Sequence, residues 1–106
     1  MPVVAATGHR FRCAVLGKYG MLQASTSPAA ASMAPRFTRD APRVSIPVLF
    51  HMQWDDELFP RKGQCALFDA LGTPEKSLIA FPGPHSTATP PAVQAWCEFV
   101  GRSLAG

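Results

Sequence analysis

The segment IPVLFHM, residues 46–52, constrains the fold of this chain more than any other segment. It is a short apolar run rich in strand-forming residues, and both faces of the strand that it would form are apolar. A strand with one face in water would instead alternate apolar and polar residues. The segment therefore predicts a parallel strand that other elements cover on both faces.

Two further strands are expected on either side of this segment. Residues 12–16 form a brief apolar run that we expect to end in a glycine turn at Gly17 and Gly20, and residues 76–81 form a third run that ends at a Pro-Gly pair. The chain has 11 prolines and 8 glycines, so the ordered elements should be short.

Helical spacing follows the second and third predicted strands. Cys65, Phe68 and Leu71 recur at intervals of three, and Gly72 is the expected stop of that helix. The last segment, TPPAVQAWCEFVGRSL, has Thr89 as N-cap and a proline at the first helical position. Its predicted buried stripe consists of Val93, Trp96, Cys97, Val100 and Leu104.

One less defined helix is expected between the first two strands. It would begin after Ser27, with Pro28 at its first position, and end at Pro35. The resulting alternation of strands and helices specifies parallel strands joined by right-handed crossovers. We therefore predict an α/β fold, a three-stranded parallel sheet with flanking helices, in one domain over residues 1–106.

Residues that can carry chemistry follow two of the predicted strands. Asp55, Asp56 and Glu57 come after the second strand, and His85 follows the third. Neighbouring parallel strands lie about 4.8 Å apart, and ligands and catalytic groups collect at their carboxyl ends. A carboxylate beside an imidazole can fix its tautomer and stabilise its charged form. We expect such a pair here, with Glu57 left as a solvated acid near a helix N-terminus.

At these residues the chain resembles the α/β-hydrolases, and more closely their dienelactone-hydrolase-like and small-esterase branch. PVLFHMQWDDELFP is similar to the acid loop of that family, FPGPHS is similar to its histidine loop, and the closing helix is similar as well. The resemblance covers nearly the whole chain, but only the C-terminal half of the family fold. It implies that His85 is the catalytic base and Asp56 the acid that orients it. Asp55 remains the rival acid.

The family nucleophile lies in a G-x-S-x-G elbow that precedes the acid and the histidine, and the sequence contains no such motif. The resemblance thus implies a C-terminal fragment of a serine hydrolase, from a truncated gene product or a mis-assigned start codon. Its parent would hydrolyse an ester, lactone or similar acyl bond of a small molecule, with no cofactor and no metal. This chain alone is expected to be inactive.

Two other function classes stay open. A non-catalytic interaction or regulatory module would retain the same half-fold. A metal-assisted hydrolase would use the three acids with His51 and His85, although their spacing fits no closed site. On its own, His51 is expected to be a core histidine, and Trp54 either lines a pocket or packs on the rim of the sheet.

The composition argues against nucleic-acid binding, a membrane span and secretion. The net charge of +3 comes from scattered Lys and Arg without a basic run, which disfavours nucleic-acid binding. Apolar stretches fall far short of the roughly 20 residues of a membrane span, and the start lacks the pattern of a signal peptide. We therefore expect a soluble, cytoplasmic chain.

Two further expectations concern the cysteines and one edge of the sheet. Cys13, Cys65 and Cys97 are expected to be free, reduced core residues, because they stand far apart among apolar neighbours. The resemblance to the α/β-hydrolases implies that the strand over residues 12–16 would pair on its outer side with the strand that leads to the nucleophile, which this sequence lacks. An unpaired apolar edge is a template for association. We expect the isolated chain to be marginally stable, to self-associate, or to depend on a partner.

Overall fold

Strand β2, Val48–Gln53, lies at the centre of a three-stranded parallel sheet of order β1-β2-β3. β1 is Ala14–Gly17 and β3 is Lys76–Phe81. In the computed structural model, which describes residues 2–7, 10–21 and 33–105, every residue of β2 is buried. The strand is therefore covered on both faces, as its sequence predicts.

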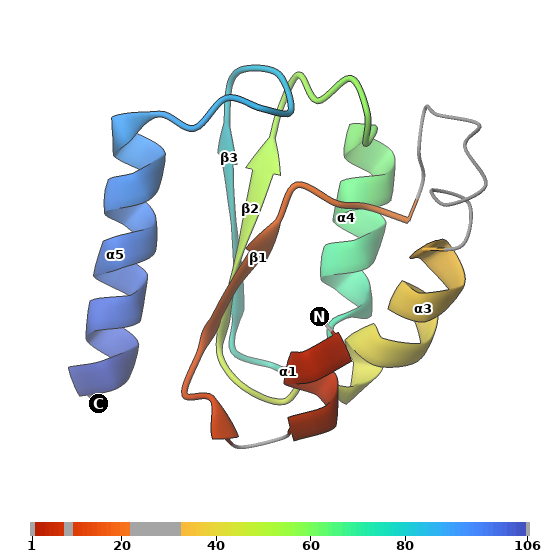
Figure 1. Ribbon diagram of the computed structural model, residues 1–106, viewed down its shortest axis with the longest axis vertical. Coiled ribbons are helices and arrows are strands. Elements are labelled where there is room, and N and C mark those ends of the chain that lie inside the picture. Colours follow the sequence, from red (N-terminus) through yellow and green to blue (C-terminus); the bar gives the residue numbers. More distant parts are fainter. Residues whose placement is uncertain (1, 8–9, 22–32, 106) are drawn as a thin grey trace.

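Helices cover the sheet in two layers (Figure 1). α4, Arg61–Ala70, and α3, Met33–Asp40, lie on one side, together with α1, Pro2–Thr7, and the 3-10 turn η2, Ala41–Arg43. α5, Pro90–Ala105, lies on the other side. The predicted α/β fold with a three-stranded parallel sheet is confirmed.

Alternate residues of β2 face the two layers, because successive side chains of a strand point to opposite faces. Val48 and Phe50 belong to the core on the α4 side, whereas His51 contacts Trp96 of α5. The fully buried core on the α4 side consists of Ala5, Phe37, Ala41, Val44, Ile46, Val48, Phe50, Leu67 and Leu71. This core holds β2 through Val48 and Phe50. The carboxyl end of β2 lies at the edge of the sheet, and the three acids follow it in the chain.

The predicted helix between the first two strands differs from the one observed. Its expected start at Ser27 and Pro28 lies outside the described residues. Pro35 does not end a helix but is the third residue of α3. A proline is tolerated there because the first N–H groups of a helix have no intrahelical acceptor to lose.

The buried faces of the other helices also differ from the predicted stripes. In α5 the buried residue is Ala92, while Val93 and Leu104 are 43% and 57% exposed. Cys65 and Cys97 are exposed and Cys13 is half-buried, so the three free cysteines are not core residues. Apolar residues surround much of α5, and the spacing alone does not select between overlapping stripes.

Two predicted glycine turns form by other means. After β1, Lys18 rather than a glycine adopts the positive φ, at 60°. Gly72 is not a left-handed helix cap; it lies against η2, where its N–H donates to the Ala41 carbonyl at 3.0 Å. A Cβ at Gly72 would collide with the carbonyl of Pro42, so the position needs glycine for close backbone approach.

The C-terminal end of α4 is capped by a lysine from β3. Lys76 Nζ donates to the carbonyl oxygens of Phe68, Asp69 and Leu71 at 3.0, 3.1 and 3.0 Å. The Phe68 carbonyl also accepts the Leu71 N–H at 3.2 Å, and the carbonyls at this end carry the negative end of the helix dipole. One ammonium group therefore ties the end of α4 to the start of β3.

We expect Lys76→Met to lower the free energy of unfolding by about 1–2 kcal/mol, because the capping bonds and the charge at the helix end are lost. Urea unfolding followed by circular dichroism measures this loss. Lys62→Met, at an exposed position of the same helix, is the control and should change stability by less than about 0.5 kcal/mol. Equal effects of the two substitutions would contradict the capping role.

Among the described residues, no strand pairs with the outer side of β1. In the same part of the chain, no helix is both long and apolar enough to cross a membrane.

Candidate active site

Two loops meet at the carboxyl edge of the sheet (Figure 1). The acid loop, residues 54–60, follows β2, and the histidine loop, residues 82–88, follows β3. The pairing of the two strands continues into these loops, because Trp54 N–H donates to the Phe81 carbonyl at 2.8 Å and Asp55 N–H donates to the Gly83 carbonyl at 3.2 Å. The sheet itself therefore sets the distance between the loops.

Asp56 and His85 are brought together. Asp56 Oδ2 lies 2.8 Å from His85 Nδ1, and the Asp56 side chain is 1% exposed whereas that of His85 is 26% exposed. The other carboxylate oxygen accepts the backbone N–H groups of Leu58 and Phe59, both at 2.8 Å. The buried carboxylate is thus held by three hydrogen bonds, and it presents an oriented imidazole to solvent.

The two neighbouring acids bind the backbone of the histidine loop. Asp55 Oδ2 accepts the Gly83 N–H at 2.9 Å, and Glu57 Oε2 accepts the His85 N–H at 3.0 Å. The hydrogen bond from His85 lowers the pKa of Glu57. Glu57 is exposed, as expected of a solvated acid, but it also binds the histidine loop, which the sequence did not predict. Gly83 has a φ of 121°, a conformation that L side chains rarely adopt, so the loop requires glycine at this point.

Two polar side chains of β2, His51 and Gln53, are buried and hydrogen-bonded to each other. His51 is 2% exposed, its Nδ1 accepts the Trp96 indole N–H at 3.0 Å, and its Nε2 pairs with Gln53 Oε1. Gln53 Nε2 in turn donates to the Pro84 carbonyl at 2.8 Å. The prediction of a satisfied core histidine is confirmed. Gln53 was missed, although a polar residue at the end of an apolar strand was the available signal.

Trp54 lies on the rim of the sheet. Its side chain is 47% exposed, and the Arg61 guanidinium carbon lies 4.2 Å from the centre of its ring. This contact fits the alternative of packing on the rim, and Trp54 lines neither of the two pockets described next.

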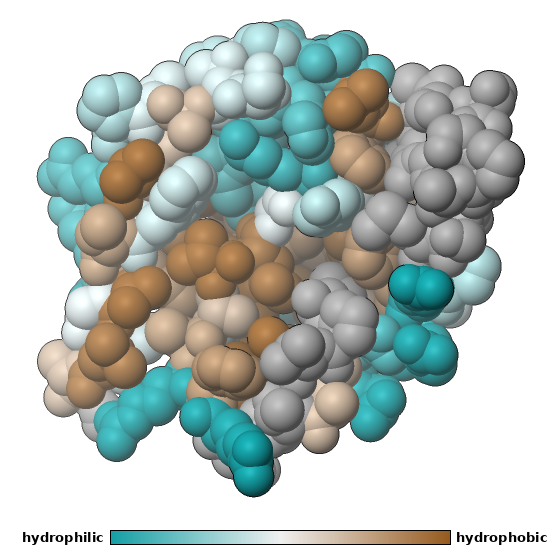
Figure 2. Space-filling model, viewed as in Figure 1, coloured by the Kyte–Doolittle hydropathy of each residue, from teal (hydrophilic) through white to brown (hydrophobic). Residues whose placement is uncertain are grey.

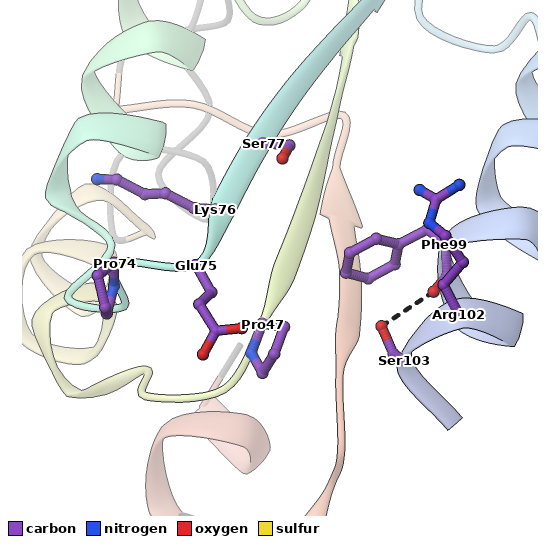
Figure 3. Close-up of a pocket in the computed structure, with 8 residues that line it drawn as sticks. All are labelled: Pro47, Pro74, Glu75, Lys76, Ser77, Phe99, Arg102 and Ser103. Atoms are coloured by element: carbon purple, nitrogen blue, oxygen red, sulfur yellow. Dashed lines mark hydrogen bonds between the residues drawn. The ribbon is translucent and has the colours of Figure 1, made fainter. Parts of the chain in front are cut away.

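Two open pockets lie away from the Asp56–His85 pair. One, of about 640 Å³, lies at the amino ends of β2 and β3 and is lined by Pro47, Pro74, Glu75, Lys76, Ser77, Phe99, Arg102 and Ser103 (Figure 3). Its lysine extends toward α4, where it caps the helix, rather than toward Arg102. The other, of about 390 Å³, lies between β1 and α5 and is lined by Val15, Leu16, Gly17, Lys18, His51 and Trp96.

Within residues 2–7, 10–21 and 33–105, no group of three or more His, Cys, Asp or Glu side chains is arranged to hold a metal ion.

Glu57→Gln should lower the stability of the chain at neutral pH, since it removes the charge that binds the His85 N–H. The pKa of Glu57 is lower in the folded chain than its ordinary value of 4.5, so its stabilising effect is full above that value and is lost as the pH falls through the folded pKa. Urea midpoints measured between about pH 7 and pH 3 should therefore converge for the two proteins. Glu98→Gln, at an exposed site on α5, is the control; a pH-independent gap for Glu57→Gln would refute this role.

Solved structures similar to this chain include those of an esterase and a lipase. The polyethylene-glycol-bound structure of a cold-adapted esterase from an Arctic intertidal metagenomic library is 35% identical, with a TM-score of 0.70 over 96% of this chain and 38% of that chain. The native structure of this esterase is also 35% identical, with a TM-score of 0.68 over 94% of this chain and 39% of that chain. A monoacylglycerol lipase of Paleococcus ferrophilus is 22% identical, with a TM-score of 0.55 over 72% of this chain and 31% of that chain, and supports the fold alone.

No protein-family model and no curated protein matches the chain. The chain spans 38% of the length of the esterase that it matches over 96% of its own. Its α/β sheet and helices thus correspond to part of an esterase structure, with an aspartate–histidine pair at the carboxyl edge of the sheet. The chain has a partial α/β-hydrolase fold.

Proposed function

We propose that this chain is the C-terminal part of a serine hydrolase that cleaves an ester, lactone or similar acyl bond of a small molecule. Asp56 and His85 would be the acid and the base of its catalytic triad. The observation that carries this proposal is the 2.8 Å contact between a buried carboxylate and a partly exposed imidazole at the carboxyl ends of β2 and β3. The 35% identity to an esterase supports it independently.

The contact supports complementary roles for the two ring nitrogens. An ionised Asp56 can only accept, so His85 Nδ1 carries a proton toward it and Nε2 keeps a free lone pair. Nε2 would take the proton of the serine hydroxyl as that oxygen attacks the acyl carbon, and would return it to the leaving group. Asp56 would stabilise the imidazolium formed between the two steps. The serine and the oxyanion donors would come from polypeptide outside this sequence.

The outer side of β1 is the surface on which we expect that polypeptide to pack. The pocket of about 390 Å³ beside β1 is lined by Val15, Leu16 and Trp96, among others. Figure 2 shows apolar side chains gathered in the hollow between α5 and the sheet. A further strand beside β1 would extend the sheet and cover this apolar surface.

The same edge favours the second candidate, a non-catalytic module that binds another chain through β1. Both candidates require a partner at this edge, but only the hydrolase requires the Asp56–His85 pair. Substitution of that pair therefore separates the two functions.

The hydrolase proposal is tested by supplying the missing part in trans. The segment of the Arctic esterase that this chain does not match would be co-expressed with it, and hydrolysis of a short-chain aryl ester would be measured. We expect saturable turnover from the pair, loss of it in His85→Ala, and none above background from this chain alone, since loss of a nucleophile costs about 10⁶-fold in a comparable triad.

Asp56→Asn should lower turnover of the complemented enzyme by about 10⁴-fold, the size of this effect in a serine protease triad, because it favours the wrong imidazole tautomer. Asp55→Asn is the matched control: its amide oxygen can still accept the Gly83 N–H, so most turnover should remain. An inactive Asp55→Asn beside an active Asp56→Asn would reverse the assignment. Full activity of both variants would refute the triad, and both must first be shown to be folded.

The isolated chain should associate through β1. We expect a concentration-dependent oligomer in size-exclusion chromatography, and Val15→Lys should shift it toward monomer because a charge on an edge strand opposes edge pairing. Val93→Lys, on the exposed side of α5, is the control and should leave the oligomer unchanged. A sharp monomer peak from the unmodified chain, with cooperative unfolding above about 60 °C, would contradict this expectation.

A further inference from the structure

A chain of hydrogen bonds that is buried at its centre and partly buried at its two ends runs from α5 through β2 to the histidine loop. Trp96 Nε1 donates to His51 Nδ1 at 3.0 Å, His51 Nε2 pairs with Gln53 Oε1, and Gln53 Nε2 donates to the Pro84 carbonyl at 2.8 Å. His51 and Gln53 are 2% and 1% exposed, so water does not readily replace the bond between their side chains. Pro84 directly precedes His85.

The direction of this chain is determined at its first member. An indole N–H can only donate, so His51 Nδ1 must accept and the ring proton must be on Nε2. Gln53 must then turn its oxygen toward His51, which leaves its NH₂ group for the Pro84 carbonyl. The opposite orientation of the Gln53 amide would place its NH₂ group against the His51 Nε2–H, two donors, and its oxygen against the Pro84 carbonyl, two acceptors. Burial also lowers the pKa of His51, which keeps the ring neutral and Nδ1 able to accept.

We propose that Gln53 is a positioning residue for the histidine loop, and that Trp96 sets its orientation through His51. The consequence is that α5 and the placement of His85 are coupled through one directional hydrogen-bond chain. The catalytic value of this placement rests on the proposed function, whereas the coupling itself does not.

The contacts of the acid loop support this role. Asp55 accepts the Gly83 N–H and Glu57 accepts the His85 N–H, so the residues on both sides of Pro84 are held by their donors. Pro84 has no N–H, and its carbonyl is the only backbone group by which it can be held. That carbonyl accepts from Gln53 Nε2 at 2.8 Å and from the Thr87 N–H of the same loop at 3.1 Å, so the Gln53 bond is the one that ties it to β2. Side chains from the end of β2 and the adjoining loop thus bind three consecutive residues, Gly83 and His85 by their N–H groups and Pro84 by its carbonyl.

The tautomer of His51 is the first test, made by ¹⁵N NMR of the imidazole nitrogens in the 106-residue chain at neutral pH. We expect a neutral ring with its proton on Nε2. A proton on Nδ1, or a charged ring, would overturn the proposal without any substitution. In Trp96→Phe the Nδ1 signal should move toward that of an unbonded nitrogen.

The coupling is tested by hydrogen exchange of the His85 backbone N–H, which donates to Glu57. Gln53→Met should speed this exchange by between about two- and twelvefold, the range expected for the loss of one hydrogen bond. Trp96→Phe should also measurably speed the exchange of the His85 N–H. Among the described residues, the hydrogen bond of the indole goes to His51 and not to the histidine loop. In the double variant, Trp96→Phe should add nothing, because Gln53 no longer transmits its effect.

Two matched controls separate this coupling from a general loss of stability. Trp54→Phe makes the same chemical change at an exposed indole, and Gln94→Met makes the same change as Gln53→Met on the surface of α5. Neither should alter exchange at His85. Additive effects in the double variant, or an effect of Trp96→Phe no larger than that of Trp54→Phe, would overturn the proposal.

If Gln53→Met does not fold, the tautomer of the unmodified chain and the exchange of Trp96→Phe still decide the question. None of these measurements requires ester hydrolysis. Failure of the complementation experiment would therefore refute the hydrolase proposal and leave this coupling standing, and the reverse also holds.

Discussion

The parallel pairing of β2 with β3 determines where the groups of the candidate site lie. Parallel strands end at the same edge, and here the backbone bonds extend past both strands, from Trp54 to Phe81 and from Asp55 to Gly83. The loops that follow therefore start in register. A one-residue slip would turn every β2 side chain to the other face and would break the contact between Asp56 and His85.

The adjacent acids have an explanation in the cost of burying charge. A carboxylate out of water must be hydrogen-bonded, and Asp56 meets that need with two backbone N–H groups and one imidazole. Asp55 and Glu57, which are exposed, instead hold the backbone of the neighbouring loop. One acidic run thus combines a buried group that orients the histidine with two groups that fix the loop carrying it.

The opposite edge of the sheet has a different character. β1 is paired on one side only among the described residues, and an apolar pocket opens beside it toward Trp96. This indole also begins the hydrogen-bond chain that reaches Pro84. A polypeptide that packed against β1 would therefore lie close to groups that position His85. Trp96 thus belongs both to the surface that a further strand would cover and to the hydrogen-bond chain that reaches the histidine loop.

The sequence by itself determined the strands, their parallel order and the pairing of an acid with His85, because these follow from short-range patterns and from the common edge of parallel strands. It did not determine which face of α5 is buried, because apolar residues occur on several faces of that helix. It also did not predict that Pro35 lies inside α3. The roles of Glu57 and Gln53 were decided only by the tertiary structure. Their partners, the His85 N–H and the Pro84 carbonyl, are distant in sequence and become neighbours only when β3 pairs with β2.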